Sequence, residues 1–179
     1  MEIQIKGTLT KEKIAGLKMG DSILYTGEMY TARDAAHKRL VALLEEGKEL
    51  PFPIENAIIY YVGPTPTKDG QVIGSAGPTT SYRMDSYTPQ LLDMGLSAMV
   101  GKGVRAEEVT ESIVKNGAIY LATIGGAAAL IAKSIVACEE ICYADLGAES
   151  IKRLEVVDFP MTVVIDCLGN NLYLSRDEM

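Results

Sequence analysis

The sequence contains few of the residues from which many catalytic and metal sites are built: one histidine and three cysteines in 179 residues. One histidine leaves no Ser-His-Asp or Cys-His arrangement to assemble, and His37 cannot build a metal site by itself. No apolar run approaches the roughly 20 residues of a membrane span. The N-terminus alternates like a strand and has no signal-peptide core. We therefore expect a cytoplasmic protein without a membrane span.

Charge and composition exclude further classes. The formal net charge of −7 argues against a nucleic-acid-binding protein, which usually carries a basic face. There is no Walker-type loop, and Gly74-Ser75-Ala76-Gly77 is not a dinucleotide-binding fingerprint. The 47% hydrophobic and 23% charged content is ordinary for a globular protein. Without a repeat or a clear linker, we expect a single domain over residues 1–179.

The cysteines allow two interpretations. Their odd number, without a signal peptide, argues against a disulfide framework. On a helix, Cys138 and Cys142 would share a face and could bind a metal ion. The β-branched residues around them predict a strand instead, in which a buried cysteine acts as a small apolar residue. We expect Cys138, Cys142 and Cys167 to be structural rather than metal ligands.

Strand and helix patterns alternate through the middle of the chain, and strands dominate the ends. This predicts an α/β fold with parallel pairing in the middle and antiparallel pieces at the edges. A hairpin around Gly169-Asn170 would close the chain. The expected strands are 2–7, 22–26, 56–62, 97–100, 118–124, 136–143, 154–157 and 162–167. The expected helices are 10–17, 31–47 with Thr31 as N-cap, 85–95, 106–116 and 127–134.

The segment from Gly74 to Asp85 combines glycine, proline, four serine and threonine hydroxyls, an arginine and a carboxylate. Thr79, Thr80 and Ser81 would offer hydroxyls and free amides at a helix start. Arg83 adds a forked cation suited to a carboxylate. The segment is typical of an anion-binding turn, although an ordinary capped turn has the same composition.

Two further cations follow expected strands. Arg33 lies at the start of a helix, where its charge opposes the helix dipole, so a second role is indicated. Lys102 lies between two glycines after an apolar strand. Because ligands gather at the carboxyl ends of parallel strands, the two residues and the Thr79–Arg83 segment could converge on a small dianion. A solvated arginine and a surface lysine are the alternatives.

At these residues the chain resembles the C-terminal part of the iron–sulfur-dependent hydro-lyases, namely class I fumarate hydratase and L-tartrate dehydratase. The motif Gly77-Pro78-Thr79-Thr80-Ser81-Tyr82-Arg83-Met84-Asp85 is the specific match, and the supporting ones run in family order over nearly the whole chain. These are Thr31-Ala32-Arg33-Asp34-Ala35-Ala36-His37-Lys38, Tyr61-Val62-Gly63-Pro64-Thr65, Gly101-Lys102-Gly103, Tyr120-Leu121-Ala122-Thr123-Ile124-Gly125-Gly126-Ala127-Ala128 and Val157-Asp158-Phe159-Pro160.

The resemblance implies a swivelling β/β/α domain that acts as the β subunit of a two-subunit enzyme. A [4Fe-4S] cluster would be bound by three cysteines of the α subunit, not by this chain, and the site would lie between the subunits. Thr79 matches the proposed catalytic base, whereas Arg33, Arg83 and Lys102 match residues that hold a dicarboxylate substrate. Fumarate hydratase is the leading expectation. L-tartrate dehydratase and a non-catalytic carboxylate-binding domain remain alternatives.

Overall fold

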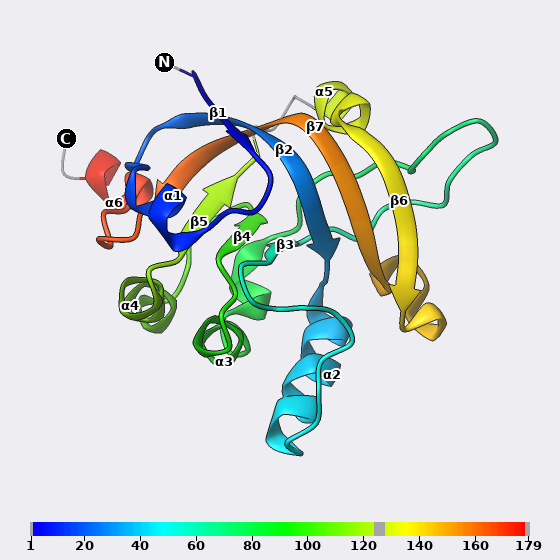
Figure 1. The fold of residues 1–179 in the computed structure, drawn as a ribbon, viewed down its shortest axis with the longest axis horizontal. Helices are drawn as coiled ribbons and strands as arrows, with labels where there is room; N and C mark the ends of the chain where they lie inside the picture. The colour runs from blue at the N-terminus through cyan, green and yellow to red at the C-terminus, as the bar shows by residue number, and fades with distance from the viewer. Residues whose placement is uncertain (1, 124–127, 178–179) are drawn as a thin grey trace.

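A computed structural model describes residues 2–123 and 128–177 of the chain (Figure 1). The strands are β1 (Glu2–Lys6), β2 (Ser22–Thr31), β3 (Ile58–Tyr60), β4 (Ala98–Gly101), β5 (Ile119–Ala122), β6 (Ile135–Cys142) and β7 (Ile151–Ile165). The α-helices are α1 (Lys11–Ala15), α2 (Asp34–Glu45), α3 (Thr88–Asp93), α4 (Glu107–Asn116), α5 (Ala128–Ser134) and α6 (Leu172–Asp177). Short 3-10 helices are η1 (Ser81–Met84) and η2 (Ala144–Glu149).

The strands form one mixed sheet in the order β1-β2-β3-β4-β5-β7-β6. Strands β1 to β5 pair in parallel, and β7 runs antiparallel to β5, β2 and β6. Because β7 also pairs with β2, the sheet closes on itself like a barrel. The α/β class with parallel pairing in the middle is thus confirmed, and the arrangement is compatible with a swivelling β/β/α domain.

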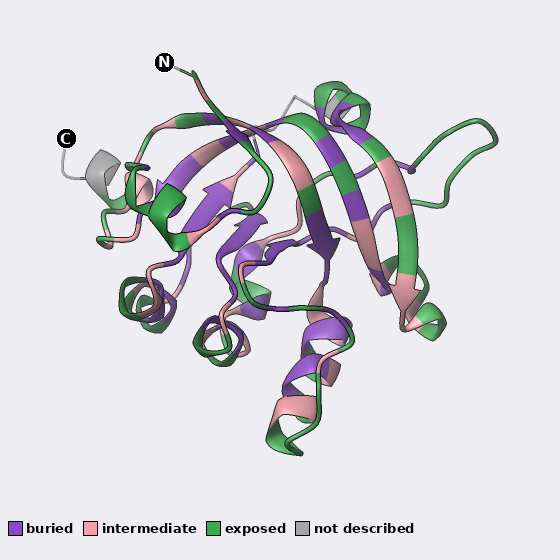
Figure 2. Ribbon diagram, in the orientation of Figure 1, coloured by how far each residue is buried: buried purple, intermediate pink, exposed green. Residues whose placement is uncertain are grey.

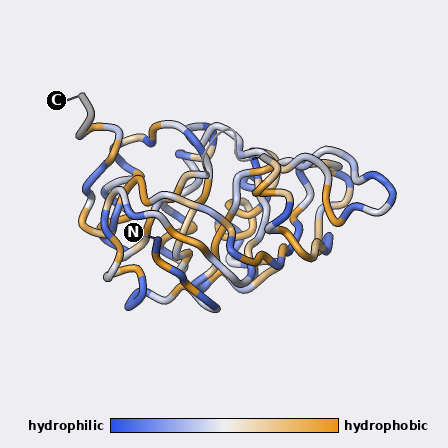
Figure 3. The backbone as a smooth tube through the Cα atoms, turned by 90° about the horizontal axis from the view of Figure 1, so that it is seen from above, coloured by the Kyte–Doolittle hydropathy of each residue, from blue (hydrophilic) through white to orange (hydrophobic). Residues whose placement is uncertain are grey.

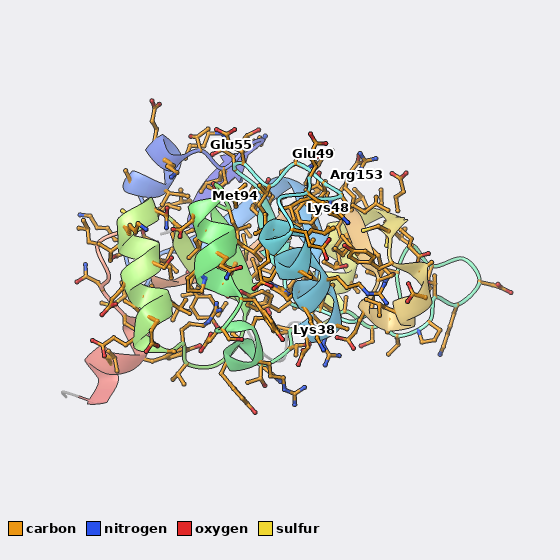
Figure 4. All side chains as sticks on the ribbon, turned by 90° about the horizontal axis from the view of Figure 1, so that it is seen from below. Lys38, Lys48, Glu49, Glu55, Met94 and Arg153 are labelled. Atoms are coloured by element: carbon orange, nitrogen blue, oxygen red, sulfur yellow. The ribbon has the colours of Figure 1, made fainter. Side chains whose placement is uncertain are left out.

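Side chains of the central strands alternate between two apolar cores. Ile58, Val100 and Leu121 point into the barrel, whereas Ile59, Met99 and Tyr120 face the helices. Helices α2, α3 and α4 lie side by side on this outer face (Figure 4). The buried residues follow the strands and the inner sides of these helices (Figure 2). We call the two clusters the barrel core and the helix-side core.

The two expected C-terminal strands, 154–157 and 162–167, are one continuous strand, β7. The strand contains Pro160, and proline donates no ladder hydrogen bond. In the structure β7 pairs with β2 along Arg153–Thr162, while on its other edge β6 and β5 pair only with 151–156 and 162–165. Pro160 falls in the gap between these partners, so the strand tolerates it.

The predicted N-cap of the second helix was wrong. Thr31 is the last residue of β2, and Arg33 occupies the N-cap position of α2 without a side-chain capping bond. The Thr31 hydroxyl instead donates to the Ser150 carbonyl (3.3 Å) and accepts from the Lys152 amide (3.0 Å). The buried Thr31 side chain thus bonds to residues at the start of the neighbouring strand β7, which the local sequence did not reveal.

Three other segments refine the expectations. Within the region expected as one helix over 85–95, the helix α3 covers only Thr88–Asp93, and the 3-10 helix η1 ends just before the region, at Met84. The start of the helix expected over 127–134 falls partly outside the described residues, and α5 begins at Ala128. The turn around Gly169-Asn170 is present, with one bridge between Ile165 and Asn171, but helix α6 follows it rather than a strand.

A long segment between β3 and η1 extends beyond the sheet at the right of Figure 1. Its tip is hydrophilic (Figure 3) and contains Lys68 and Asp69. Across the base of this loop, the Thr65 amide donates to the Ser75 carbonyl at 3.0 Å. In the parts of the chain that the structure describes, no helix combines the length and apolar character needed to cross a membrane.

Candidate functional site

The sequence-predicted residues lie at the carboxyl ends of neighbouring parallel strands. Arg33 comes two residues after the end of β2, and Lys102 directly follows β4. Between them, β3 leads into the stretch 61–63. Parallel strands bring their carboxyl ends to one edge of a sheet. The backbone positions of Arg33 and Lys102 therefore lie at the same end of the sheet, as expected.

Thr79 and Lys102 are brought together by backbone hydrogen bonds. The Thr79 amide donates to the Tyr61 carbonyl at 2.7 Å, and the Ser81 amide donates to the Lys102 carbonyl at 2.9 Å. Thr80 and Lys102 form an isolated parallel bridge. The expectation of free amides in this segment is therefore corrected for Thr79 and Ser81, whose N–H groups fasten the segment to the strand ends.

Gly101 explains how closely the two segments can approach. A Cβ at this position would collide with the Ser81 hydroxyl and come within 2.8 Å of Tyr61 Cδ2 and 3.3 Å of the Thr79 carbonyl oxygen. Only glycine leaves this space empty. The glycine before Lys102 therefore serves the packing of the Thr79 segment against the end of β4.

Arg33 lies over the end of the next strand. A Cβ on Gly63 would be 3.0 Å from Arg33 Cδ, so the arginine side chain covers this glycine. Its Nε is 3.9 Å from carboxylate oxygens of both Asp34 and Glu149. These distances exceed a hydrogen bond, and Nε is buried with no hydrogen-bond partner. A buried donor without a partner is unusual and indicates a missing acceptor.

Arg83 and Lys102 are exposed cations at the same edge. Neither belongs to an ion pair in the described part of the chain. Arg83 lies in η1. Exposed Tyr82 and Val104, at 60% and 63% of their surface, flank these cations.

Sequence reasoning missed a buried ion pair below this edge. Arg105 Nε donates to Asp85 Oδ1 at 2.7 Å, and its Nη2 donates to Thr88 Oγ1 at 3.0 Å and to the Tyr61 hydroxyl at 3.2 Å. The Arg105 side chain is fully buried. Asp85 Oδ2 also accepts from the Ala106 amide just before α4. Asp85 was visible in the glycine-proline-threonine motif, but nothing in the local sequence pointed to Arg105 as its partner.

His37 is the second buried polar group that the sequence left without a role. Its Nδ1–H donates to the Arg33 carbonyl at 2.8 Å, and its Nε2 is buried without a hydrogen-bond partner. The ring packs edge-on against Tyr61, with centroids 5.4 Å apart. Burial lowers the pKa of His37 from 6.5 to about 4, so the ring is neutral at pH 7. His37 therefore supports the backbone of Arg33 without adding charge.

The cysteines occupy β6 and the residues after β7. Cys138 and Cys142 are on β6, as predicted, and Cys167 follows β7; all three are unpaired and half-buried. Burial raises the pKa of the Cys138 and Cys142 thiols, which disfavours the thiolate needed for metal binding. Among residues 2–123 and 128–177, no three His, Cys, Asp or Glu side chains are grouped to hold a metal ion.

The chain is similar to a known protein family and to several individual proteins. The model of the fumarase C-terminus matches residues 1–176. "Fumarate hydratase class I, anaerobic" of Escherichia coli is 45% identical over 150 residues, which are 83% of this chain and 27% of that protein. "Fumarate hydratase 2" of Leishmania major is 36% identical over 177 residues, or 97% of this chain and 31% of that protein.

A third relative differs in length. "Putative L(+)-tartrate dehydratase subunit beta" of Methanocaldococcus jannaschii is 39% identical over 171 residues, covering 92% of this chain and 88% of that protein. The chain thus spans less than a third of the two fumarate hydratases but most of the subunit beta.

Proposed function

This chain belongs to the fumarase C-terminus family, and we propose on that basis that it is the β subunit of a two-subunit fumarate hydratase. The reaction is the reversible hydration of fumarate to L-malate. In this proposal residues 1–179 form one catalytic domain, located in the cytoplasm. An α subunit completes the site and supplies a [4Fe-4S] cluster.

The observation that carries the proposal is that Arg33, Arg83 and Lys102 have no carboxylate within hydrogen-bond distance in the described residues. Arg83 and Lys102 have no ion-pair partner in the described residues, and Arg33 keeps its carboxylate neighbours at 3.9 Å. The buried Nε of Arg33 has no acceptor. A dicarboxylate would supply the missing anions, and arginine is the side chain best shaped to bind a carboxylate.

Thr79 is placed beside Lys102 by the backbone bonds of its segment. Elimination of water from malate removes a proton from one carbon while hydroxide leaves the next. In our proposal the Thr79 oxygen takes that proton, and Arg33, Arg83 and Lys102 hold the carboxylates and hydroxyl in position. The cations also stabilise the negative charge that builds on the substrate as the C–H bond breaks. A threonine hydroxyl is a weak base in water, and nearby cations favour its ionised form.

The cysteines of this chain do not fit an iron–sulfur cluster. Cys138 and Cys142 are four residues apart on one strand, which separates them by roughly 13 Å along β6. Cluster iron is held by cysteine thiolates, and no three-residue ligand group exists in the described residues. We therefore assign the cluster to the α subunit and derive no step of the reaction through it.

L-tartrate dehydratase is the second candidate, because a relative of which this chain covers 88% is named "Putative L(+)-tartrate dehydratase subunit beta". The two substrates are both small dicarboxylates that differ in hydroxyl groups, so the same cations could serve either. A non-catalytic carboxylate-binding domain is the third possibility. The presence of Thr79 together with all three cations favours catalysis over binding alone.

The test is co-expression of this chain with a candidate α subunit from the same organism under anaerobic conditions. We expect an iron-containing brown complex that hydrates fumarate, whereas the isolated chain is colourless and inactive. Assay of the complex with L-tartrate separates the two dehydratase candidates. Hydratase activity or stoichiometric iron in the isolated chain would contradict the proposed division between the subunits.

A further inference from the structure

Two hydrogen bonds to consecutive carbonyls hold the backbone at Lys102 and Gly103. The Ser81 amide donates to the Lys102 carbonyl at 2.9 Å. The Tyr120 hydroxyl donates to the next carbonyl, that of Gly103, at 2.8 Å. Tyr120 also contacts the Ser81 hydroxyl at 2.7 Å, and because its own proton points to Gly103, Ser81 is the donor in this pair. One hydroxyl thus joins the Thr79–Ser81 segment to the loop after Lys102.

Tyr120 is itself fixed by its surroundings. It lies in β5, is fully buried and faces the helix-side core. The Arg105 guanidinium carbon lies 4.9 Å from the centre of its ring and 5.2 Å from that of Tyr61, so the charge contacts both rings. Asp85 anchors Arg105 at 2.7 Å. The tyrosine hydroxyl therefore has a defined position relative to η1 and the end of β4.

The chemistry of the hydroxyl makes it a constant donor. Burial raises the pKa of Tyr120 above its ordinary value, so the phenol stays protonated at neutral pH. Packing alone would not require an oxygen here, because the barrel core fills the other face of the same strands with Ile119 and Leu121. A buried hydroxyl is costly unless its hydrogen bonds are made. Its two bonds fix the Gly103 carbonyl and the Ser81 hydroxyl, next to Lys102 and Thr79.

We propose that Tyr120 is a positioning residue: its hydroxyl fixes Gly103 and Ser81 and thereby sets the relative placement of Lys102 and Thr79. It does not touch the substrate. The effect of Tyr120 on turnover rests on the proposed function. The positioning of the two segments is a property of the chain itself and is measurable without substrate.

The kinetic arm uses the complete complex with its α subunit. Tyr120→Phe removes only the oxygen and should lower kcat/KM for the accepted dicarboxylate by about 5- to 100-fold, as expected for a buried hydrogen-bond network left unsatisfied. In a Lys102→Arg background, where the positioned ammonium is gone, the same change should cost less than threefold. Tyr25→Phe is the matched control, since it also deletes a buried hydroxyl bonded to backbone carbonyls, those of Gly7 and Glu28.

Two kinetic outcomes overturn the proposal. One is a Tyr120→Phe complex with unchanged kcat/KM. The other is an equal loss in the wild-type and Lys102→Arg backgrounds, because a general loss of structure would be additive. Tyr25→Phe should stay within about twofold of wild type.

The second arm measures amide hydrogen exchange in the full chain, with and without the α subunit. In Tyr120→Phe, peptides covering 79–83 and 100–105 should exchange at least about fivefold faster, while peptides from β1 and α1 stay unchanged. Exchange that is unaltered in both site peptides overturns the positioning role. If the wild-type complex acts on neither fumarate nor tartrate, the proposed function fails, and this exchange result alone decides the role of Tyr120.

Discussion

The two faces of the same central strands differ in chemistry. The barrel core packs aliphatic and aromatic side chains such as Val100, Leu121 and Phe159. The helix-side core contains similar apolar residues but also surrounds the buried basic side chains His37 and Arg105. These polar groups lie against Tyr61 and Tyr120, directly beneath the edge that carries Thr79 and Lys102.

The difference separates what folds the chain from what shapes its site. A buried charge costs free energy unless it is paired, and replacing such a pair by apolar residues is often neutral or stabilising. The barrel core shows that these strands pack well without one. We therefore interpret the Arg105–Asp85 pair and His37 as supports of the residues Thr79 and Lys102 above them.

The largest effect on activity is expected for Thr79→Val, which keeps the side-chain shape and removes the oxygen. If the hydroxyl transfers the proton, kcat of the α–β complex should fall by about 10²–10⁴ with little change in KM. The free energy of unfolding should hardly change, because Thr79 is not in either core. Thr79→Ser should retain part of the activity. A rise in KM at constant kcat would instead assign Thr79 to substrate positioning.

Phe159→Ala tests the barrel core. Phe159 is fully buried in the barrel core and packs edge-on against Tyr60, with ring centroids 5.4 Å apart. Its truncation should lower the free energy of unfolding by about 3–5 kcal/mol, measured by urea denaturation of the full chain. Where the variant is folded, kcat of the complex should stay near wild type. A large loss of kcat in fully folded protein would show that the two regions are not separable.

His37 gives the helix-side core a pH dependence that the barrel core lacks. Its pKa is about 4 in the folded chain and about 6.5 when unfolded. The unfolded chain therefore binds more protons between these values, so stability is lost as the pH falls from about 6.5 through 4. Between pH 7 and pH 4 this amounts to about 3 kcal/mol. The His37→Leu variant should lack that part of the decline. Identical pH profiles for the two proteins would show that His37 is not buried in the neutral form.

The smallest effect is expected at the cysteines. Replacing Cys138, Cys142 and Cys167 together by alanine should lower stability modestly, because half-buried apolar groups are removed. Activity per complex and iron content should remain near wild type. Loss of iron from the triple variant would move the cluster ligands from the α subunit to this chain.

Sequence periodicity was sufficient for the α/β class and for most elements, because each central strand is a short apolar run between clear turn residues. It failed where tertiary contacts decide. Thr31 had the composition of a helix cap but bonds across the sheet to Ser150 and Lys152. The two expected strands 154–157 and 162–167 form one strand, in which Pro160 lies where one edge of β7 is unpaired.

For the site, local motifs indicated Arg33, Thr79, Arg83 and Lys102, and these remain predictions about function. The supporting groups were not recoverable in the same way. Arg105 is 20 residues from Asp85, and no spacing rule pairs them. Tyr120 resembles any aromatic residue of a buried strand until its hydroxyl partners are known.

The most direct measurement of the central claim compares two arginines of one region in the complete α–β complex. Arg33 carries a buried Nε without an acceptor, whereas Arg39, on the same helix α2, is half-exposed and pairs with Asp145. Changing either to lysine keeps the charge and loses the fork. We predict that Arg33→Lys lowers kcat/KM for the dicarboxylate by about 2–4 kcal/mol, or roughly 30- to 1,000-fold, while Arg39→Lys leaves it within about twofold. An unchanged kcat/KM in Arg33→Lys would place the substrate elsewhere and contradict the account.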